Sequence, residues 1–289
     1  MFQIENDHLQ VSIKARGAEL DSIFQKSTGM EYLWNADPNY WAKKSPVLFP
    51  IVGTLKDDTY FFEEKAYRLS RHGFARDMDF ELANQMKNSL ELAIHSNPST
   101  LAHYPFPFQF SVGYVLEENT LQVRYTVSNT GEVPMYFSVG GHPAFKVPVK
   151  DGLQYEDYYL EFNEEENAGR WPISGAGLIK SSPIPLLQNS HQLALTKELF
   201  LQDALVFKDL KSNSVQLKTD KDSHGWRFDF TGFPYLGIWA AKQANFVCIE
   251  PWCGIADAVD TDQQLIRKEG IVLLEAGKTF EKNWSISIF

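Results

Sequence analysis

Short runs in which apolar and polar residues alternate recur along this chain, and they constrain its fold more than any other feature. In residues 9–16, Leu9, Val11 and Ile13 alternate with polar residues, and Gly17 follows the run. A period of two residues is typical of a half-buried β-strand, and glycine often marks the turn after it. We therefore expect the chain to begin with a strand.

Residues 121–128 show the same alternation and lead into the turn signal Asn129-Thr130-Gly131. Because a second apolar run, residues 135–139, follows this turn, we expect the two runs to form a hairpin. Further strands are expected at residues 214–219, 226–231, 236–240, 246–250, 271–274 and 284–289.

Helical patterns are few, with one or two turns in residues 191–201 and a short piece in residues 262–268. Many short strands separated by turns predict an all-β protein, an antiparallel sandwich or barrel, rather than βαβ units. Residues 163–185 hold an acidic run, three glycines and three prolines, and are expected to form a long surface loop. Strand patterns resume on both sides of it, so we expect one domain over residues 1–289.

Composition argues against large anionic partners. The chain has 27 Lys and Arg against 37 Asp and Glu, and its net charge of −10 opposes binding to nucleic acid or to an anionic membrane. The first residues lack a signal-peptide pattern and no apolar run reaches membrane-spanning length, so we expect a cytoplasmic protein. The two cysteines, Cys248 and Cys253, have no paired Cys/His set for zinc. We expect both to be reduced and Cys248 to lie in the core.

Residues 70–76 form a basic segment in an acidic protein. His72 lies there between Arg71 and Arg76, beside a glycine that lets backbone or ligand approach closely. His72 is therefore a candidate site residue. The alternative is a solvated turn whose arginines pair with neighbouring acids.

A second candidate, His142, follows Gly140 and Gly141 and precedes Pro143. The glycines allow close approach of the backbone and the proline fixes the direction of the chain, so the imidazole should point in a defined direction. The alternative is a hydrogen-bonded histidine at a sheet edge.

A third candidate, Glu250, ends an apolar strand that we expect Pro251 to stop. Partial burial raises the pKa of a carboxyl group, which suits a general base, and Trp252 adds a stacking face. The alternative is a strand-end glutamate paired with an arginine. Motifs for zinc hydrolysis, serine hydrolysis and nucleotide binding are absent, and the other histidines lie in polar contexts, so acid–base chemistry is the hypothesis that remains.

Three segments carry a resemblance: RHGFAR at 71–76, GGHPAF at 140–145 and ANFVCIEPW at 244–252. In this order, and across nearly the whole chain, they resemble the aldose 1-epimerase (galactose mutarotase) family, most of all its LacX-like branch. Residues 46–53 and 233–239 support the match. The resemblance implies a large antiparallel β-sandwich, a supersandwich with few short helices, that holds a sugar in a cleft on a concave sheet.

The resemblance also implies roles for single residues. Glu250 takes the place of the catalytic base, His142 that of the acid and His72 that of a second active-site histidine, with no metal or other cofactor. Asp203 takes the place of an aspartate that binds sugar hydroxyls. Local sequence context, and not the resemblance, adds Arg71, Arg76 and Trp252 to the expected substrate-binding set. Relatives often carry arginine where this chain has Thr54, and Arg71 is our candidate for the missing guanidinium contact.

Three functions compete. The first is an isomerase that interconverts the anomers of a free monosaccharide of galactose or glucose type, working as a monomer or homodimer. The second is a sugar-binding or regulatory protein without useful turnover. The third is an epimerase of hexose 6-phosphates, which requires that four cations converge on the cleft: Arg71, Arg76, Lys43 and Lys44.

Overall fold

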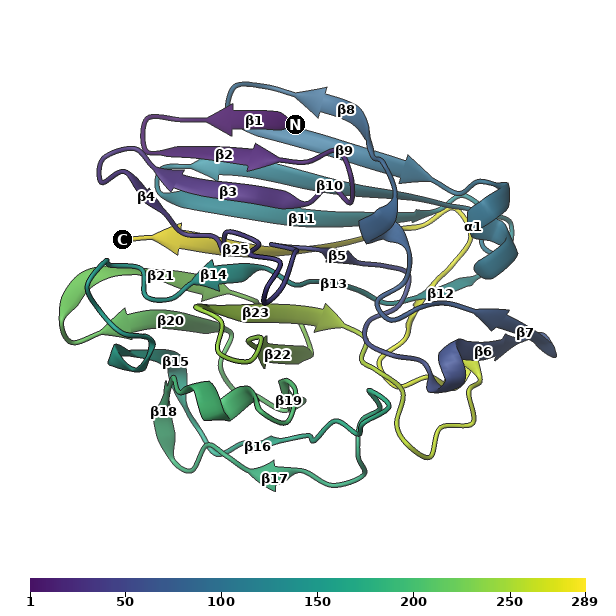
Figure 1. Cartoon of the computed structure of the whole chain (residues 1–289). Coiled ribbons are helices and arrows are strands. Elements are labelled where there is room, and N and C mark those ends of the chain that lie inside the picture. Colours follow the sequence, from purple (N-terminus) through teal and green to yellow (C-terminus); the bar gives the residue numbers. More distant parts are fainter.

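A computed structural model describes all 289 residues, and it shows a β-rich molecule built of two main layers (Figure 1). One layer is a nine-stranded antiparallel sheet. Its strands, in spatial order, are β18 (Ser190–Ala194), β15 (Tyr158–Glu166), β20 (Ser214–Thr219), β21 (Asp222–Asp229), β25 (Thr279–Ile288), β11 (Thr120–Asn129), β10 (Phe108–Glu117), β9 (Ser89–His95) and β8 (Glu81–Gln85). The expected all-β antiparallel class is confirmed.

The other layer combines two smaller sheets. A four-stranded sheet has the order β1 (Phe2–Glu5), β2 (Leu9–Ile13), β3 (Leu20–Gln25) and β4 (Met30–Glu31). A six-stranded sheet has the order β19 (Leu205–Phe207), β22 (Tyr235–Trp239), β23 (Phe246–Cys253), β13 (Val139–Gly141) and β5 (Val47–Leu48), with β14 (Ala144–Lys146) also paired to β23. The segment after β4 joins them, because Lys146 N donates to Tyr32 O and Trp34 N to Ala144 O.

Three two-stranded ribbons and a few short helices complete the chain. The ribbons are β6 (Thr59–Phe62) with β7 (Lys65–Arg68), β12 (Met135–Phe137) with β24 (Val272–Leu274), and β16 (Gly169–Arg170) with β17 (Ile184–Pro185). The α-helix is α1 (Pro98–His103), and the 3₁₀ helices are η1 (Lys56–Asp58), η2 (Ala75–Asp77), η3 (Tyr155–Asp157), η4 (Lys197–Phe200) and η5 (Leu265–Arg267). None of the helices is long and apolar enough to cross a membrane.

Aromatic side chains fill the space between the layers. The ring of Phe49, which follows β5, stacks on Phe110 of β10 with centroids 4.5 Å apart. The ring of Phe145 in β14 lies 4.7 Å from Trp226 in β21. Such pairs contribute beyond their buried area, so the layers are held by the residues that give the chain its high aromatic content.

The hairpin expected from residues 121–128 and 135–139 is wrong. β11 pairs along its length with β10 on one edge and β25 on the other, so it has no free edge. β12 pairs instead with β24. The turn therefore carries the chain out of the nine-stranded sheet, and Asn129 Nδ2 secures that exit by donating to Val133 O and Leu274 O.

Two other expectations need correction. Helix was expected over residues 191–201, but β18 occupies the first part and only η4 is helical, because Leu193 and Leu195 point inward with a period of two. The expected surface loop at 163–185 begins with the end of β15 and is closed by the β16–β17 ribbon. Its central part packs inward, since Ile179 is buried. The short helical piece at 262–268 is present as η5.

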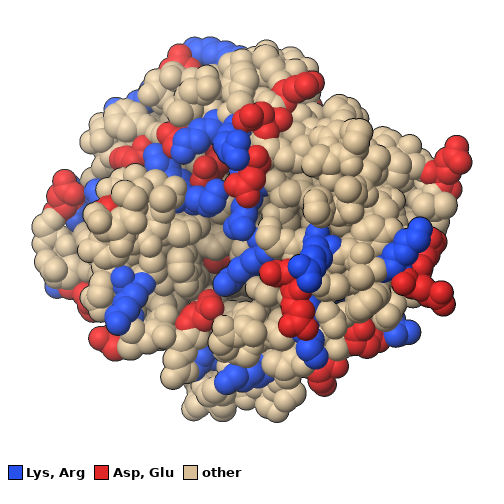
Figure 2. Space-filling model, turned by 45° about the vertical axis from the view of Figure 1, so that its right-hand side comes forward, with Lys and Arg blue, Asp and Glu red and all other residues tan.

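Charged side chains of both signs are interspersed over the face of the molecule shown in Figure 2, so no area of one sign covers that face.

Candidate active site

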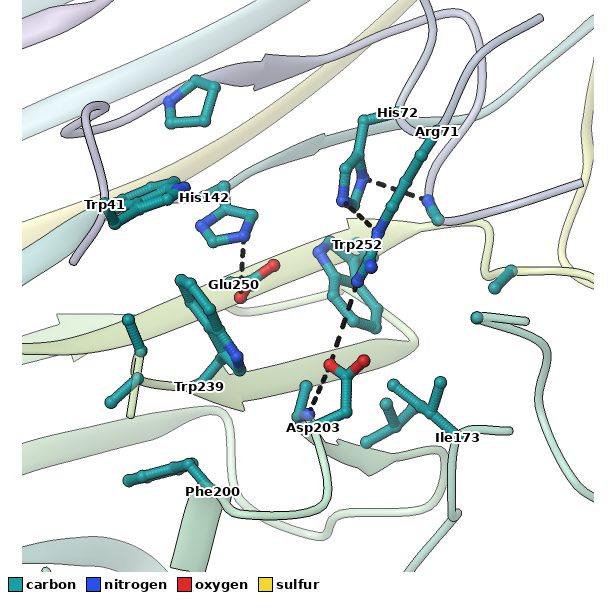
Figure 3. Close-up of a pocket in the computed structure, with 18 of the residues that line it drawn as sticks. Trp41, Arg71, His72, His142, Ile173, Phe200, Asp203, Trp239, Glu250 and Trp252 are labelled. Atoms are coloured by element: carbon teal, nitrogen blue, oxygen red, sulfur yellow. Dashed lines mark hydrogen bonds and ion pairs between the residues drawn. The ribbon is translucent and has the colours of Figure 1, made fainter. Parts of the chain in front are cut away.

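A cavity of about 500 Å³ opens over the six-stranded sheet, and Figure 3 shows most of the residues that line it. Each of the seven site residues expected from the sequence lies on this cavity. They are His72, His142 and Glu250 together with Arg71, Arg76, Asp203 and Trp252. Residues distant in the chain, on loops and on strands, thus meet at one place.

β23 supplies the floor of the cavity. Glu250 and Trp252 are two residues apart on this strand and therefore point to the same face. The backbone position opposite Glu250 on β22 is Gly237, and a Cβ atom there would overlap the ring of Trp252. Because Gly237 has no side chain, the indole of Trp252 can pack directly against its backbone.

The strand does not stop at Pro251 as expected but runs on to Cys253. One edge of β23 pairs with β22 through both Glu250 and Trp252, so the proline does not interrupt it. On the other edge the ladder breaks between β14 and β13, where Pro143 and Pro251 both lack an N–H donor.

The register across this break sets the central contact. Gly140 pairs with Trp252 and Ala144 with Cys248, and counting inward from either pair places His142 opposite Glu250. The two side chains meet, with His142 Nε2 3.2 Å from Glu250 Oε1 (Figure 3). Both residues are buried. Facing positions on adjacent strands thus make a pair from residues more than a hundred positions apart.

The two glycines before His142 are required by close approach. A Cβ atom at Gly140 would come 2.8 Å from the carbonyl oxygen of Pro251, and one at Gly141 would come 2.6 Å from Tyr125 Oη in the other layer. Both distances are shorter than carbon–oxygen contacts allow. The backbone just before His142 therefore lies closer to its neighbours than any residue other than glycine would permit.

His72 sits in a turn of unusual backbone geometry. Its φ is +68° and that of Gly73 is +70°, a region that side chains other than glycine rarely adopt. Gly53 N donates to His72 Nδ1 at 3.1 Å, so the neutral ring carries its proton on Nε2. Burial lowers the pKa of His72 well below its ordinary value, which favours that neutral ring.

Both ring nitrogens of His72 lie near an N–H donor, Nδ1 near Gly53 N at 3.1 Å and Nε2 near Arg71 Nε at 3.3 Å (Figure 3). A neutral imidazole accepts at only one nitrogen, and the shorter backbone contact assigns that role to Nδ1, so the N–H groups of His72 Nε2 and Arg71 Nε are both donors beside the cavity. An acceptor oxygen in the cavity could bind both. Arg76 holds the backbone of Arg71 in position, since its Nη2 donates to the carbonyl of Arg71 at 2.7 Å. Asp203 Oδ1 lies 3.9 Å from Arg71 Nη2 and presents an acceptor from the opposite side.

Two tryptophans of the site were missed by the sequence reasoning. Trp41 stacks on His142 with ring centroids 4.9 Å apart, and Trp239 meets the same imidazole edge-on at 5.6 Å. Trp239 lies in segment 233–239, which supported the resemblance, and within the strand expected at residues 236–240. The sequence therefore held a signal that could have identified it. Trp41 lies in a loop without periodicity, so no pattern identified it.

The loop between β16 and β17 closes one side of the cavity. Ile173, Gly177 and Ile179 line it, and Ile179 N donates to Asp257 O. A Cβ atom at Gly177 would come 2.6 Å from Thr54 Oγ1, so this loop occupies the space next to Thr54. The space beside Thr54, where the resemblance led us to expect an arginine, is therefore filled by backbone.

Of the four cations expected to bind the phosphate of a hexose 6-phosphate, only the two arginines lie on the cavity. Lys43 Nζ lies 3.6 Å from Asp77 Oδ1 and Lys44 Nζ lies 3.1 Å from Asp21 Oδ1, and neither lysine lines the cavity. That part of the expectation is wrong, because both lysines find carboxylates outside the cavity. Lys242, which the sequence did not single out, does line it.

Burial governs the protonation of the central pair. It lowers the pKa of His142 from 6.5 to about 3, and it raises the pKa of Glu250 well above 4.5 against the opposing charge of Arg71. Both shifts favour uncharged forms. The pair therefore retains one proton that both groups can hold, and that proton can cross the 3.2 Å contact.

The sequence model of the aldose 1-epimerase family matches residues 1–283. The chain belongs to the aldose 1-epimerase family. It is 35% identical to the plasmid-encoded protein LacX of Lactococcus lactis subsp. lactis over an alignment of 297 positions that covers 99% of each chain.

Solved structures of this family have the same fold. A galactose mutarotase related enzyme from Lactobacillus acidophilus is 38% identical, with a TM-score of 0.95 over 100% of this chain and 97% of that one. A galactose mutarotase-like protein from Lactobacillus casei is 30% identical, with a TM-score of 0.92 over the whole of both chains. These aldose 1-epimerase relatives confirm the family expected from the three sequence segments.

Proposed function

We propose that this member of the aldose 1-epimerase family interconverts the α and β anomers of a free aldose. Family membership supports an isomerase of this type and a sugar substrate. The observation that carries the proposal is the contact between His142 Nε2 and Glu250 Oε1 on the cavity floor. Opening a cyclic hemiacetal requires one proton acceptor and one proton donor, which this pair provides.

In the proposed reaction, Glu250 accepts the proton of the anomeric hydroxyl while His142 gives a proton to the ring oxygen. The C1–O5 bond breaks and leaves an open-chain aldehyde. Rotation about C1–C2 presents the other face of the carbonyl, the C5 hydroxyl attacks it, and both protons return to their original groups. The reactive form, imidazolium with carboxylate, holds as many protons as the uncharged pair. Proton transfers alone balance the reaction, so we propose that it needs no cofactor.

The surrounding side chains suit a sugar. We propose that Nε2 of His72 and the guanidinium of Arg71 donate to one sugar oxygen, since these donors converge on one region of the cavity. Asp203 would accept from hydroxyls on the opposite side. Trp252 offers an apolar ring face against which the C–H groups of a pyranose can pack.

Anomeric exchange of glucose and galactose, followed by NMR, tests the proposal. The parent should accelerate exchange over the buffer rate, and Glu250→Gln and His142→Asn should each lower that acceleration by about 10²–10⁴ while retaining sugar binding. Lys43→Ala is the matched control, since Lys43 lies outside the cavity. Unchanged exchange in both site variants would contradict the assignment. Sugar binding without exchange in the parent would favour a non-catalytic sugar-binding protein.

A phosphorylated sugar is the second candidate, because Arg71, Arg76 and Lys242 line the cavity. The carboxylate of Asp203 lines it too and faces Arg71 at 3.9 Å, which offsets part of this positive charge before a phosphate dianion could bind. We therefore favour a neutral sugar. The comparison is kcat/KM for glucose against glucose 6-phosphate in the parent and in Arg71→Ala. A preference for the phosphate that Arg71→Ala abolishes would reverse our choice.

A further inference from the structure

Cys248 lies against the catalytic pair and takes no part in the mechanism proposed above. It precedes Glu250 by two residues on β23 and points to the same face. One donor atom each from His142, Cys248 and Glu250 can be chosen so that all three lie within 4.8 Å of one another, and all three residues are buried. Cys248 is buried and does not line the cavity.

These three donors match the ligand preferences of zinc. Zinc binds thiolate sulfur at about 2.3 Å, imidazole nitrogen at about 2.0–2.1 Å and carboxylate oxygen at about 2.0–2.2 Å. Ligand atoms around one tetrahedral ion therefore stand roughly 3–4 Å apart. His142 and Glu250 already have that separation at 3.2 Å, and the sulfur, which lies within 4.8 Å of both, needs a movement of at most about 1 Å.

Charge balance favours the ion in this buried place. Binding would displace the thiol proton of Cys248 and the proton shared by His142 and Glu250, and both protons leave to solvent. One thiolate, one carboxylate and one neutral imidazole then neutralise the double charge of the ion. A neutral cluster avoids the large cost of burying net charge.

We propose that His142, Cys248 and Glu250 form a site for a thiophilic divalent cation such as Zn²⁺, and that its occupation stops the isomerase. The ion would hold the lone pairs that ring opening needs on His142 and Glu250. The inhibitory part rests on the proposed function, whereas the binding part does not. The bound cation would then be an inhibitor of the reaction and not a cofactor for it.

The binding test uses cobalt as a spectroscopic substitute for zinc. Metal-free protein titrated with Co²⁺ should develop a thiolate-to-cobalt charge-transfer band in the near ultraviolet. Cys248→Ala and Cys248→Ser should both lack this band. Serine is close to cysteine in size, so the second variant shows that loss of the band in the first does not come from altered packing. Cys253→Ala is the matched control, because Cys253 is buried on the same strand but points to its other face. No band in the parent, or a band that persists in Cys248→Ala, would overturn the site.

The inhibition test measures anomeric exchange against added Zn²⁺. The parent and Cys253→Ala should be inhibited, and Cys248→Ala should need at least about tenfold more zinc for the same loss of rate. Equal sensitivity of parent and Cys248→Ala, or acceleration by zinc, would overturn the inhibitory role. If the protein had no isomerase activity, the cobalt band would still form, so failure of the proposed function and failure of the metal site are separable.

Discussion

At the scale of single residues, burial favours the uncharged forms of His142 and Glu250, and on this ground we propose that the two exchange a proton. Four apolar residues before Glu250 were enough to predict that its carboxyl is desolvated, and the burial of this residue confirms it. The contact with His142 was not predictable from local sequence, because it depends on a register between β13, β14 and β23 that only long-range pairing fixes. Trp41 lay beyond prediction because its loop has no periodic pattern.

The pH dependence of kcat/KM tests the protonation of this pair. Burial lowers the pKa of His142 to about 3, so the pair gains a second proton only in strong acid. Burial raises the pKa of Glu250, so the pair loses its proton only well above pH 4.5. We therefore expect exchange, corrected for the buffer rate, not to fall as the pH is lowered through 6.5, the ordinary histidine value. An acid limb centred near that value would contradict the account.

Stability should respond to the same burial. The pKa of Glu250 is higher in the folded than in the unfolded chain, so the folded state holds a proton that the unfolded state has released. Stability from this group is therefore complete below the unfolded pKa and declines as pH rises. Glu250→Gln removes the cost of ionising a buried carboxyl group at high pH. The urea midpoint of unfolding should therefore rise at about pH 8 and stay nearly unchanged at about pH 4. A variant less stable than the parent at the higher pH would refute this.

At the scale of elements, sequence alternation located most strands but not their partners. The strand at 121–128 was correct, yet its expected hairpin was wrong because β10 and β25 fill both of its edges. Pro251 was taken as a strand end because the sequence does not show which edge of a strand needs its N–H donors. Alternation reports which face is buried, while pairing depends on the rest of the sheet.

The β22–β23 pair offers an element-scale prediction. Gly237→Ala would place a Cβ atom in the ring of Trp252, so the indole must move and we expect a loss of about 1–3 kcal/mol in the free energy of unfolding. KM for the sugar should rise as Trp252 leaves its place. The control is Gly175→Ala in the loop over the cavity, where a Cβ atom meets nothing within 4 Å. Urea unfolding and exchange kinetics check both variants, and equal effects in the two would contradict the packing argument.

At the scale of the whole molecule, the two layers share one core. The last strand, β25, lies in the middle of the nine-stranded sheet, between β21 and β11 (Figure 1). The sheet is therefore continuous only when strands from distant parts of the chain have paired. The all-β class was predictable from periodicity, whereas the stacking of the layers came only from the family resemblance. We propose that residues 1–289 form one domain and expect far-ultraviolet circular dichroism and tryptophan fluorescence to report a single, coincident unfolding transition. Two separated transitions would indicate two domains.

The central claim is that His142 and Glu250 act as one unit, and a double-variant cycle tests it most directly. Anomeric exchange is measured for the parent, Glu250→Gln, His142→Asn and the combined variant. If each group needs the other, either single change removes the advantage of the pair, and the combined variant should be about as slow as the slower single one. Losses that multiply across the two changes would show that the groups act independently and would contradict the account.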